Sequence, residues 1–326
     1  MRGVTIKALW GGWLLLGVAM MASSLALAVD DWPRTFTNVD GSETTIPGPP
    51  RRILSTSVTI TGTLLAIDAP LVASATSANG HFFDQWEGVA QERGVQRLWP
   101  AGSVDLETAY AVEPDLIVVS ASGADSALAQ VPSLQAIAPT IVLDYGGQTW
   151  QSLARQLGEA SGLEDQVDAK LAEFDDYLAQ SRYKISVPEG EANIISYNGP
   201  GAPNPIALSD GVHGQLLQAL GFTIESPARE WQSDANSAQD FVRAQYEYLT
   251  QMRAPTTFLL SAGDERAAAF LDDPILANLP SVQAGQVYGL GANSFRIDFF
   301  SATEVIDGIV ERFGANHDDD RRRSVQ

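Results

Sequence analysis

The sequence has no cysteine among its 326 residues. Disulfide bonds, thiolate metal ligands and a lipid anchor on an N-terminal cysteine are therefore excluded, and a chain of this length can bury a core without them. Histidine is almost as scarce, since only His81, His213 and His317 are present, each in a distant segment. Direct capture of zinc or manganese needs clustered histidine and carboxylate ligands, so the sequence disfavours that function.

Basic residues are few, with 20 Lys and Arg against 40 Asp and Glu, for a net charge of −20. Residues 1–28 carry two bases and no acid, so removing them would take the net charge from −20 to −22. A chain this acidic is not expected to bind nucleic acid or anionic lipid over a broad surface. An anionic ligand would have to be held by a local group of basic side chains.

Long hydrophobic runs are missing everywhere except near the N-terminus. The apolar run from Ala8 to Met21 follows Arg2 and Lys7 and precedes the small residues Ala26-Leu27-Ala28. This order is typical of a secretory signal peptide, which we predict to be residues 1–28, cut after Ala28. We therefore expect a periplasmic protein that is soluble after cleavage.

Catalytic motifs are also missing. The sequence contains no G-x-S-x-G elbow, no paired His-Glu zinc motif and no phosphate-cradling glycine loop. Asp68, Asp144 and Asp298 each stand alone beside a predicted element, with no partner evident from the spacing. We predict that the protein is not an enzyme and has no cofactor.

A long helix is the central feature of what is present. Residues 164–185 contain neither glycine nor proline, and Pro188 follows. Apolar residues recur there at spacings of three and four, which indicates one packed helical face: Leu163, Val167, Leu171, Phe174 and Leu178. Such a helix spans roughly 30 Å. Short apolar strands alternate with helical patterns on both sides of it, which predicts an α/β fold of two lobes joined by a single long rigid helix.

The first half of the chain shows strand patterns separated by helical ones. The expected strands are 52–55, 71–74, 95–98, 116–120 and 141–144, preceded by a hairpin of 34–37 and 44–46 around Asp40-Gly41. The expected helices are 59–67, one opened by Ser103, and 150–159, which Gly162 separates from the long helix. Ser55, Thr56 and Ser57 stand where a strand passes into a helix, so they either cap that helix or also face a ligand crevice.

The second half repeats this alternation. The expected strands are 192–197, 258–261 and 286–290, and the expected helices are 213–220, ended by Gly221, and 301–313. The resulting division is signal peptide 1–28, N-terminal extension 29–50, N-terminal lobe 51–147, linking helices 148–186, C-terminal lobe 187–314 and a charged tail 315–326, which we expect to be disordered.

Several long stretches resemble a known family. These are RRILSTSVTITGTLLAIDAPLVAS, LETAYAVEPDLIVVSASGADSAL, SLQAIAPTIVLDY, TWQSLARQLGEASG and NLPSVQAGQVYGLGANSFRIDFFSATEVID. Together they are similar to the periplasmic binding proteins that serve iron–siderophore importers, over about residues 32–313. The resemblance implies two α/β lobes bridged by one long helix, as predicted above from periodicity. It also implies capture of a metal chelate between the lobes and its delivery to an ABC permease in the inner membrane.

The ligand that the resemblance implies is a ferric catecholate siderophore of the ferric enterobactin type. Such a complex is a trianion whose iron is held by the siderophore, so no metal is bound directly by the protein. Arginines can face its catecholate oxygens with paired donors, and aromatic rings can stack on its catechol rings. The candidate ligand-binding residues, chosen by position at strand ends and in loops, are Arg97, Arg296, Arg243, Trp99, Tyr197, Trp231 and Phe295.

Docking to the permease would use different residues. The resemblance implies one exposed glutamate on each lobe, and the matching positions are Glu107 in DLETAYAVEPDL and Glu247 in AQYEYLTQM. Each would pair with arginines of the permease across the interface. The protein itself is expected to be monomeric.

A different ligand on the same fold is the alternative. The alternatives are haem, cobalamin or a hydroxamate siderophore. Haem and cobalamin would also suit an aromatic cleft, and their axial ligation needs at most one histidine. In that case the residue of interest is His81, in the loop Asn79-Gly80-His81-Phe82-Phe83.

Overall fold

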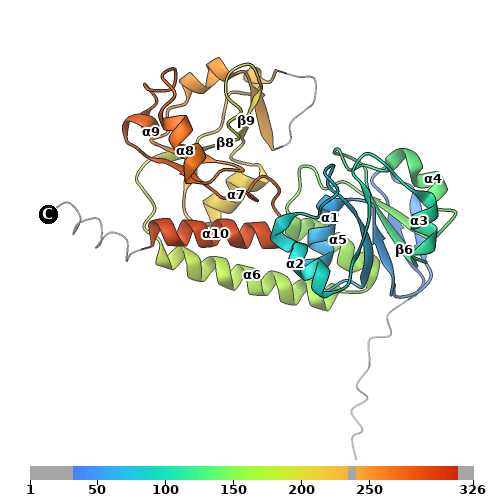
Figure 1. The fold of residues 1–326 in the computed structure, drawn as a ribbon. Helices are drawn as coiled ribbons and strands as arrows, with labels where there is room; N and C mark the ends of the chain where they lie inside the picture. The colour runs from blue at the N-terminus through green and yellow to red at the C-terminus, as the bar shows by residue number, and fades with distance from the viewer. Residues whose placement is uncertain (1–31, 234–239, 315–326) are drawn as a thin grey trace, which may run out of the picture. The chain divides into compact units, whose positions relative to one another are not determined.

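The computed structural model describes residues 32–233 and 240–314 (Figure 1). The predicted signal peptide 1–28 and charged tail 315–326 lie outside these residues. Within the described ranges, no helix combines the length and the apolar character needed to cross a membrane.

A five-stranded parallel sheet forms the first lobe. Its strand order is β5-β4-β3-β6-β7, so the first strand along the chain lies in the middle. The strands are β3 (Ile53–Ser55), β4 (Leu71–Thr76), β5 (Gln96–Pro100), β6 (Leu116–Ser120) and β7 (Thr140–Leu143). All five were predicted. Strands β3, β4, β6 and β7 carry apolar runs, because strands covered on both faces need little polar alternation, whereas β5 is partly exposed.

Strand β6 shows how this sheet is buried. Leu116 and Val118 belong to the main core, whereas Ile117 and Val119 belong to a smaller cluster on the other face. Successive side chains of a strand point to opposite faces, so a continuous apolar run serves both cores. The sheet is therefore covered on each side.

The helices of the first lobe are α1 (Val58–Ala66), α2 (Asp84–Glu92), α3 (Leu106–Ala111), α4 (Val131–Leu134), which follows the 3₁₀ turn η1 (Leu128–Gln130), and α5 (Trp150–Ser161). Three of them, α1, α3 and α5, begin at a residue whose side chain caps them. The Ser57 side chain caps α1. The helix expected to open at Ser103 begins later, because the Asp105 carboxylate accepts hydrogen bonds from the N–H groups of Glu107 and Thr108.

The N-terminal hairpin is confirmed. Strands β1 (Arg34–Thr37) and β2 (Glu43–Ile46) pair antiparallel, and Phe36 and Ile46 are buried in the main core. Asn38 joins the hairpin to the first lobe, since its side chain accepts a hydrogen bond of 2.8 Å from the N–H of Val142.

The second lobe has a six-stranded mixed sheet of order β11-β9-β8-β12-β13, with β10 also paired to β8. Its strands are β8 (Glu191–Ile195), β9 (Asn204–Ala207), β10 (Thr223–Ile224), β11 (Phe241–Ala244), β12 (Thr256–Leu259) and β13 (Val287–Gly289). Its helical segments are α7 (Val212–Ala219), η2 (Arg229–Trp231), η3 (Tyr246–Gln251), α8 (Asp264–Leu271), α9 (Pro280–Gln283) and the last helix, α10 (Phe299–Phe313). Strands β8, β12 and β13 are parallel, while β9 and β11 are antiparallel additions.

The long helix is confirmed as α6 (Glu164–Lys184). Gly162 separates it from α5 by adopting the left-handed conformation (φ 72°), which glycine takes without a steric penalty. Val167, Leu171 and Phe174 are buried as the periodicity predicts. The two-lobe α/β architecture is thereby confirmed.

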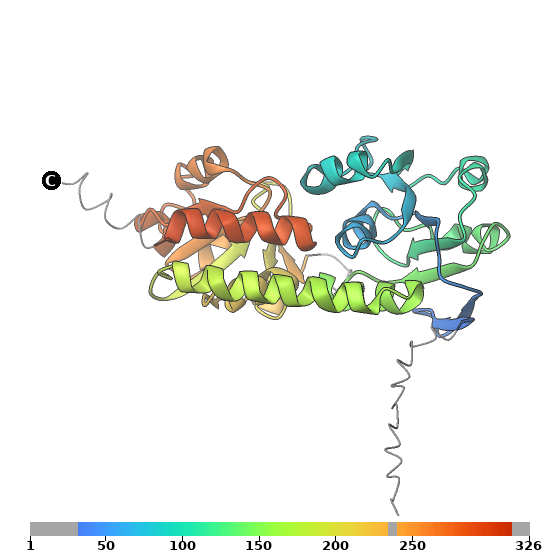
Figure 2. The same ribbon diagram turned by 90° about the horizontal axis from the view of Figure 1, so that it is seen from below.

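A second helix contributes to the connection between the lobes. Helix α10 lies alongside α6 in both views (Figures 1 and 2) and also contacts α1 and α2 of the first lobe. The prediction of a long linking helix is confirmed in α6, and the last helix of the chain adds a contact that the sequence did not predict, because it returns to the first lobe.

Candidate binding cavity

A cavity of about 620 Å³ has walls from both lobes. Its first wall comes from α1 and from the loops that follow β6 and β7, and its second wall from α7, β11 and the segment before α10. Open α/β sheets bind ligands beyond the carboxyl ends of their strands, and this cavity lies at such ends in the first lobe. Its volume suits a small-molecule ligand.

Three of the predicted ligand-binding residues, Arg296, Phe295 and Arg243, line this cavity together. The Arg296 guanidinium carbon lies 5.5 Å from the centroid of the Phe295 ring and 5.8 Å from that of Tyr145. Because Tyr145 belongs to the first lobe, this contact crosses the cavity. Phe295 in turn stacks on Phe241, with ring centroids 5.4 Å apart and planes 5° from parallel.

Tyr145 is held from behind by a buried carboxylate. Its hydroxyl donates a hydrogen bond of 2.9 Å to Oδ1 of Asp125. The other carboxylate oxygen accepts from the Ser57 hydroxyl at 2.6 Å and from the N–H of Thr59 at 3.0 Å. Burial, followed by the charge of Asp125, raises the pKa of Tyr145 to about 12, so its hydroxyl stays protonated and donates.

The cavity also contains two aspartates, equal in number to its arginines among the described residues. The Asp144 carboxylate accepts hydrogen bonds from the Ser122 hydroxyl and from the N–H of Gly146, while that of Asp240 accepts from the N–H of Val212 at 3.3 Å. Both carboxylates are thus engaged by loop or helix donors. Arg243 and Arg296 are the only cationic side chains in the described lining.

His213 is the histidine that lines the cavity. Its Nε2 lies 2.9 Å from the carbonyl oxygen of Ser294, while its buried Nδ1 has no hydrogen-bond partner among the described residues. Burial lowers the pKa of His213 to about 4, so the ring is neutral at pH 7. The ring packs against Phe241 at 5.0 Å between centroids.

Arg97 and Trp99 do not line the cavity. Both belong to β5, the outer strand of the sheet on the side opposite β6 and β7. The Arg97 guanidinium pairs with Glu87 and lies over the ring of Phe82, and Trp99 is buried in the smaller core of the first lobe. Strand order separates them from the cavity, although each stands near a strand end.

Tyr197 and Trp231 also lie apart from the cavity lining. The Tyr197 hydroxyl donates to Asp273 at 2.6 Å, and its ring meets Phe270 edge to face. Trp231 stacks on Tyr248, with centroids 5.4 Å apart. Both rings therefore pack against the smaller core of the second lobe.

The remaining predicted residues all lie outside the cavity lining. Glu107 lies in the first turn of α3 and Glu247 in η3, and both side chains are exposed, as docking residues must be. His81 is exposed in its loop and is absent from the cavity lining. Ser55, Thr56 and Ser57 are buried and outside that lining, and Thr59 and Thr63 of α1 face the cavity in their place.

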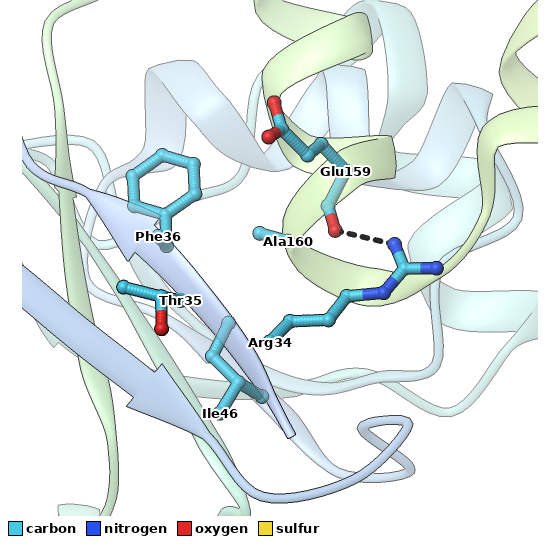
Figure 3. A pocket seen from close by; sticks show the side chains of 6 residues that line it. All are labelled: Arg34, Thr35, Phe36, Ile46, Glu159 and Ala160. Carbon is cyan, nitrogen blue, oxygen red and sulfur yellow. Dashed lines mark hydrogen bonds between the residues drawn. The ribbon is translucent and has the colours of Figure 1, made fainter. Parts of the chain in front are cut away.

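A smaller hollow of about 250 Å³ lies where the hairpin meets α5 (Figure 3). Arg34 crosses it and donates a hydrogen bond of 2.8 Å to the carbonyl oxygen of Glu159. Arg34 also pairs with Glu164, the first residue of α6. This arginine therefore fastens the hairpin to the helices that link the lobes.

Sequence reasoning missed Tyr145, His213 and Phe241. Tyr145 directly follows the strand predicted at 141–144, so the argument that favoured residues at strand ends could have identified it. His213 opens a predicted helix, but the sequence carries no sign that this helix faces the cavity. Phe241 lies on β11, a strand that was not predicted.

Comparison with known proteins agrees with this architecture. The ferric enterobactin-binding periplasmic protein FepB of Escherichia coli O6:H1 (strain CFT073) is 40% identical over 310 residues, which cover 92% of this chain and 97% of that protein. The crystal structure of holo-ViuP superposes with a TM-score of 0.86 at 56% identity, covering 88% of this chain and 97% of that one. The FhuD protein from S. pseudintermedius shares the fold, with a TM-score of 0.67 at 18% identity over 85% of this chain and 96% of that one.

A family profile described as periplasmic binding protein matches residues 53–294, which include both sheets and most of the cavity lining. The match covers more than half of the chain, and the relative from Escherichia coli extends the similarity to nearly its whole length. The chain therefore belongs to the periplasmic binding protein family.

Proposed function

We propose that this protein captures a ferric catecholate siderophore of the ferric enterobactin type in the cavity between its lobes and delivers it to an ABC permease of the inner membrane. Proteins of this family are binding components of transport systems, in agreement with the predicted lack of catalysis. The 40% identity to a ferric enterobactin-binding protein supports this ligand class.

The observation that carries the proposal is the position of Arg296. Its guanidinium lies between an aromatic ring from each lobe, at 5.5 and 5.8 Å. Among the described residues it forms no ion pair, so its donors can face catecholate oxygens. Rings beside the guanidinium can stack on catechol rings, so one corner of the cavity offers charge and aromatic surface together.

The overall charge of the protein opposes an anionic ligand at long range. Screening limits this repulsion to about 10 Å at ordinary ionic strength, so the local arrangement decides binding. Arg243 supplies the second positive charge of the described lining, and both cavity aspartates accept hydrogen bonds from nearby donors. The proposal therefore rests on the charge of Arg296, with Arg243 as a further cation of the same lining.

Delivery would use the exposed glutamates. Glu107 lies on the first lobe and Glu247 on the second, which suits a partner with one basic pocket for each lobe. A periplasmic location follows from the family, and the ligand would leave the cavity for the permease.

Tryptophan fluorescence can test the ligand class. Five of the seven tryptophans lie after residue 28, and Trp150 lines the cavity, so an iron chelate bound there should quench emission. Residues 29–326 are titrated with ferric enterobactin, haem and a ferric hydroxamate in parallel. We expect saturable quenching by the catecholate complex, and saturation by haem or the hydroxamate alone would overturn the proposal.

Two arginine variants localise the site. We expect Arg296→Gln to weaken binding of the catecholate complex by about 10- to 100-fold, because a charge-assisted hydrogen bond is lost. Arg97→Gln makes the same charge change outside the cavity and is expected to leave affinity within about twofold. Equal losses in both variants would indicate a general charge effect and contradict the proposed site.

A further inference from the structure

We propose that Tyr145 is a ligand-contacting residue of this cavity and that Asp125 is its positioning residue, together fixing where Arg296 presents its charge. This inference rests on the proposed function and names residues of the first lobe that would determine affinity there. Tyr145 and Arg296 line the cavity, whereas Asp125 is buried behind it and acts through Tyr145.

The Asp125 carboxylate is placed to hold Tyr145 because its two oxygens have different partners. Oδ2 accepts from the Ser57 hydroxyl and the N–H of Thr59 at the start of α1. Oδ1 accepts from the Tyr145 hydroxyl at 2.9 Å. A buried charge-assisted hydrogen bond restrains the phenol, so the ring can face the cavity with a fixed orientation.

Gly123 provides the space that this arrangement needs. It lies in the loop after β6 with φ of +85°, and a Cβ atom there would be 1.6 Å from the Tyr145 hydroxyl oxygen. No other residue type can occupy this position while Tyr145 keeps its place. The loop after β6 is therefore shaped around the side chain that follows β7.

The ring of Tyr145 then restricts Arg296. The guanidinium lies over Tyr145 from one lobe and beside Phe295 from its own lobe. When aromatic rings hold a guanidinium, its N–H groups remain available to donate hydrogen bonds to a ligand. When a carboxylate holds it, the same N–H groups are engaged in the ion pair. Removing the Tyr145 ring would release Arg296 on one side and remove an aromatic surface from the ligand.

The ligand chemistry that suits this pair is a flat aromatic ring with adjacent oxyanions. Such a ring can stack on Tyr145 while its oxygens accept hydrogen bonds from Arg296. An aliphatic hydroxamate complex offers no ring for the tyrosine. Loss of the Tyr145 ring should therefore weaken a catecholate complex more than a hydroxamate complex.

The test is a double-mutant cycle on residues 29–326, with affinity for ferric enterobactin measured by fluorescence titration. We expect Tyr145→Leu to weaken binding by about tenfold or more, and Tyr145→Phe and Asp125→Asn by about three- to tenfold each. If Asp125 acts through the Tyr145 hydroxyl, the double variant Asp125→Asn with Tyr145→Phe should match the single variants within about twofold.

Denaturant unfolding separates this role from a structural one. Asp125→Asn also weakens the cap of α1, so its unfolding midpoint should fall in the wild-type and in the Tyr145→Phe background alike.

Additive losses of affinity in the cycle would overturn the positioning role. Wild-type affinity in Tyr145→Leu would overturn the inference as a whole. Failure of the wild-type protein to bind the complex would instead overturn the proposed function, and this inference with it.

Discussion

Gln85 donates a hydrogen bond of 3.2 Å to the buried carboxylate of Asp298, joining α2 of the first lobe to the start of the last helix. The other carboxylate oxygen accepts from the N–H of Ser301 at 2.9 Å and so caps α10. One side chain therefore begins the last helix and fastens it to the first lobe.

Gly62 of α1 makes this contact possible. A Cβ atom there would lie 2.5 Å from Oδ2 of Asp298 and 2.9 Å from Nε1 of Trp86. We expect Gly62→Ala to lower the free energy of unfolding by about 1–3 kcal/mol, because overpacking at this joint outweighs the gain in helix propensity. Urea unfolding at pH 7 measures the change.

Gly308 of α10 is the matched control, since a Cβ atom there meets nothing within 4 Å. Gly308→Ala should raise the free energy of unfolding by about 0.5–1 kcal/mol. Stabilisation by Gly62→Ala of the same size would show that the joint accommodates a methyl group and would contradict the prediction.

The Asp298 carboxylate should make stability depend on pH. Burial raises the pKa of Asp298 to about 6 from 3.8, so the folded protein binds a proton between these values that the unfolded chain does not. Protonation of Asp298 therefore favours the folded state. This contribution to the free energy of unfolding, roughly 3 kcal/mol, is fully present below about pH 4 and is lost as pH rises through 6. Urea unfolding between pH 4 and 7 should therefore show the advantage of wild type over Asp298→Asn shrinking as pH rises. An advantage that stays constant would contradict the raised pKa.

His213 should act with the opposite sign. Burial lowers its pKa to about 4 from 6.5, so the unfolded chain binds the proton that the folded protein excludes. The neutral ring of His213 contributes roughly 3 kcal/mol to the free energy of unfolding. That contribution is fully present above pH 6.5 and is lost as pH falls towards 4. His213→Phe removes the titration, so the free energy of unfolding of wild type relative to this variant should fall with falling pH. Calorimetry or urea unfolding over the same range measures it, and a parallel pH profile for the two proteins would contradict it.

The proposed docking role of Glu107 and Glu247 can be tested apart from ligand capture. We expect Glu107→Ala with Glu247→Ala to keep the affinity for the ferric siderophore and to abolish uptake by cells that carry the permease. The pair Glu92→Ala with Glu265→Ala makes the same charge change at other exposed positions on the two lobes and should leave uptake intact. Normal uptake by the first double variant would exclude these residues from docking.

Much of the fold was predictable because its central elements carry strong local patterns. Strand β6 is a continuous apolar run and α6 repeats apolar residues at helical spacing, so each could be placed within one residue of its bounds. Helix α2 was missed because only Trp86 and Ala90 are buried along it. Strands β9 and β11 were missed because Asn204, Pro205 and Arg243 interrupt any apolar run, and because β11 pairs with a strand that is distant in sequence.

The cavity was less predictable because strand order is not a local property. Arg97 stands near a strand end, and Arg296 lies between the last strand and the last helix. From the sequence alone, the two arginines are equally good candidates for binding the ligand. The sheet places β5 at its outer edge, away from the loops after β6 and β7 that line the cavity. The contact of Tyr145 with Asp125, beside Gly123, forms only when the loops after β6 and β7 have met.

The late position of Arg296 and Asp298 bears on how the chain folds during its synthesis. The sheet of the first lobe is built from one uninterrupted stretch, residues 53–143, and its strand pairing needs nothing that comes later. The second wall of the cavity and the joint at α10 are complete only when nearly the whole chain has been made. Strand pairing in the first lobe can therefore precede synthesis of the second lobe, whereas the cavity acquires both of its walls only at the end.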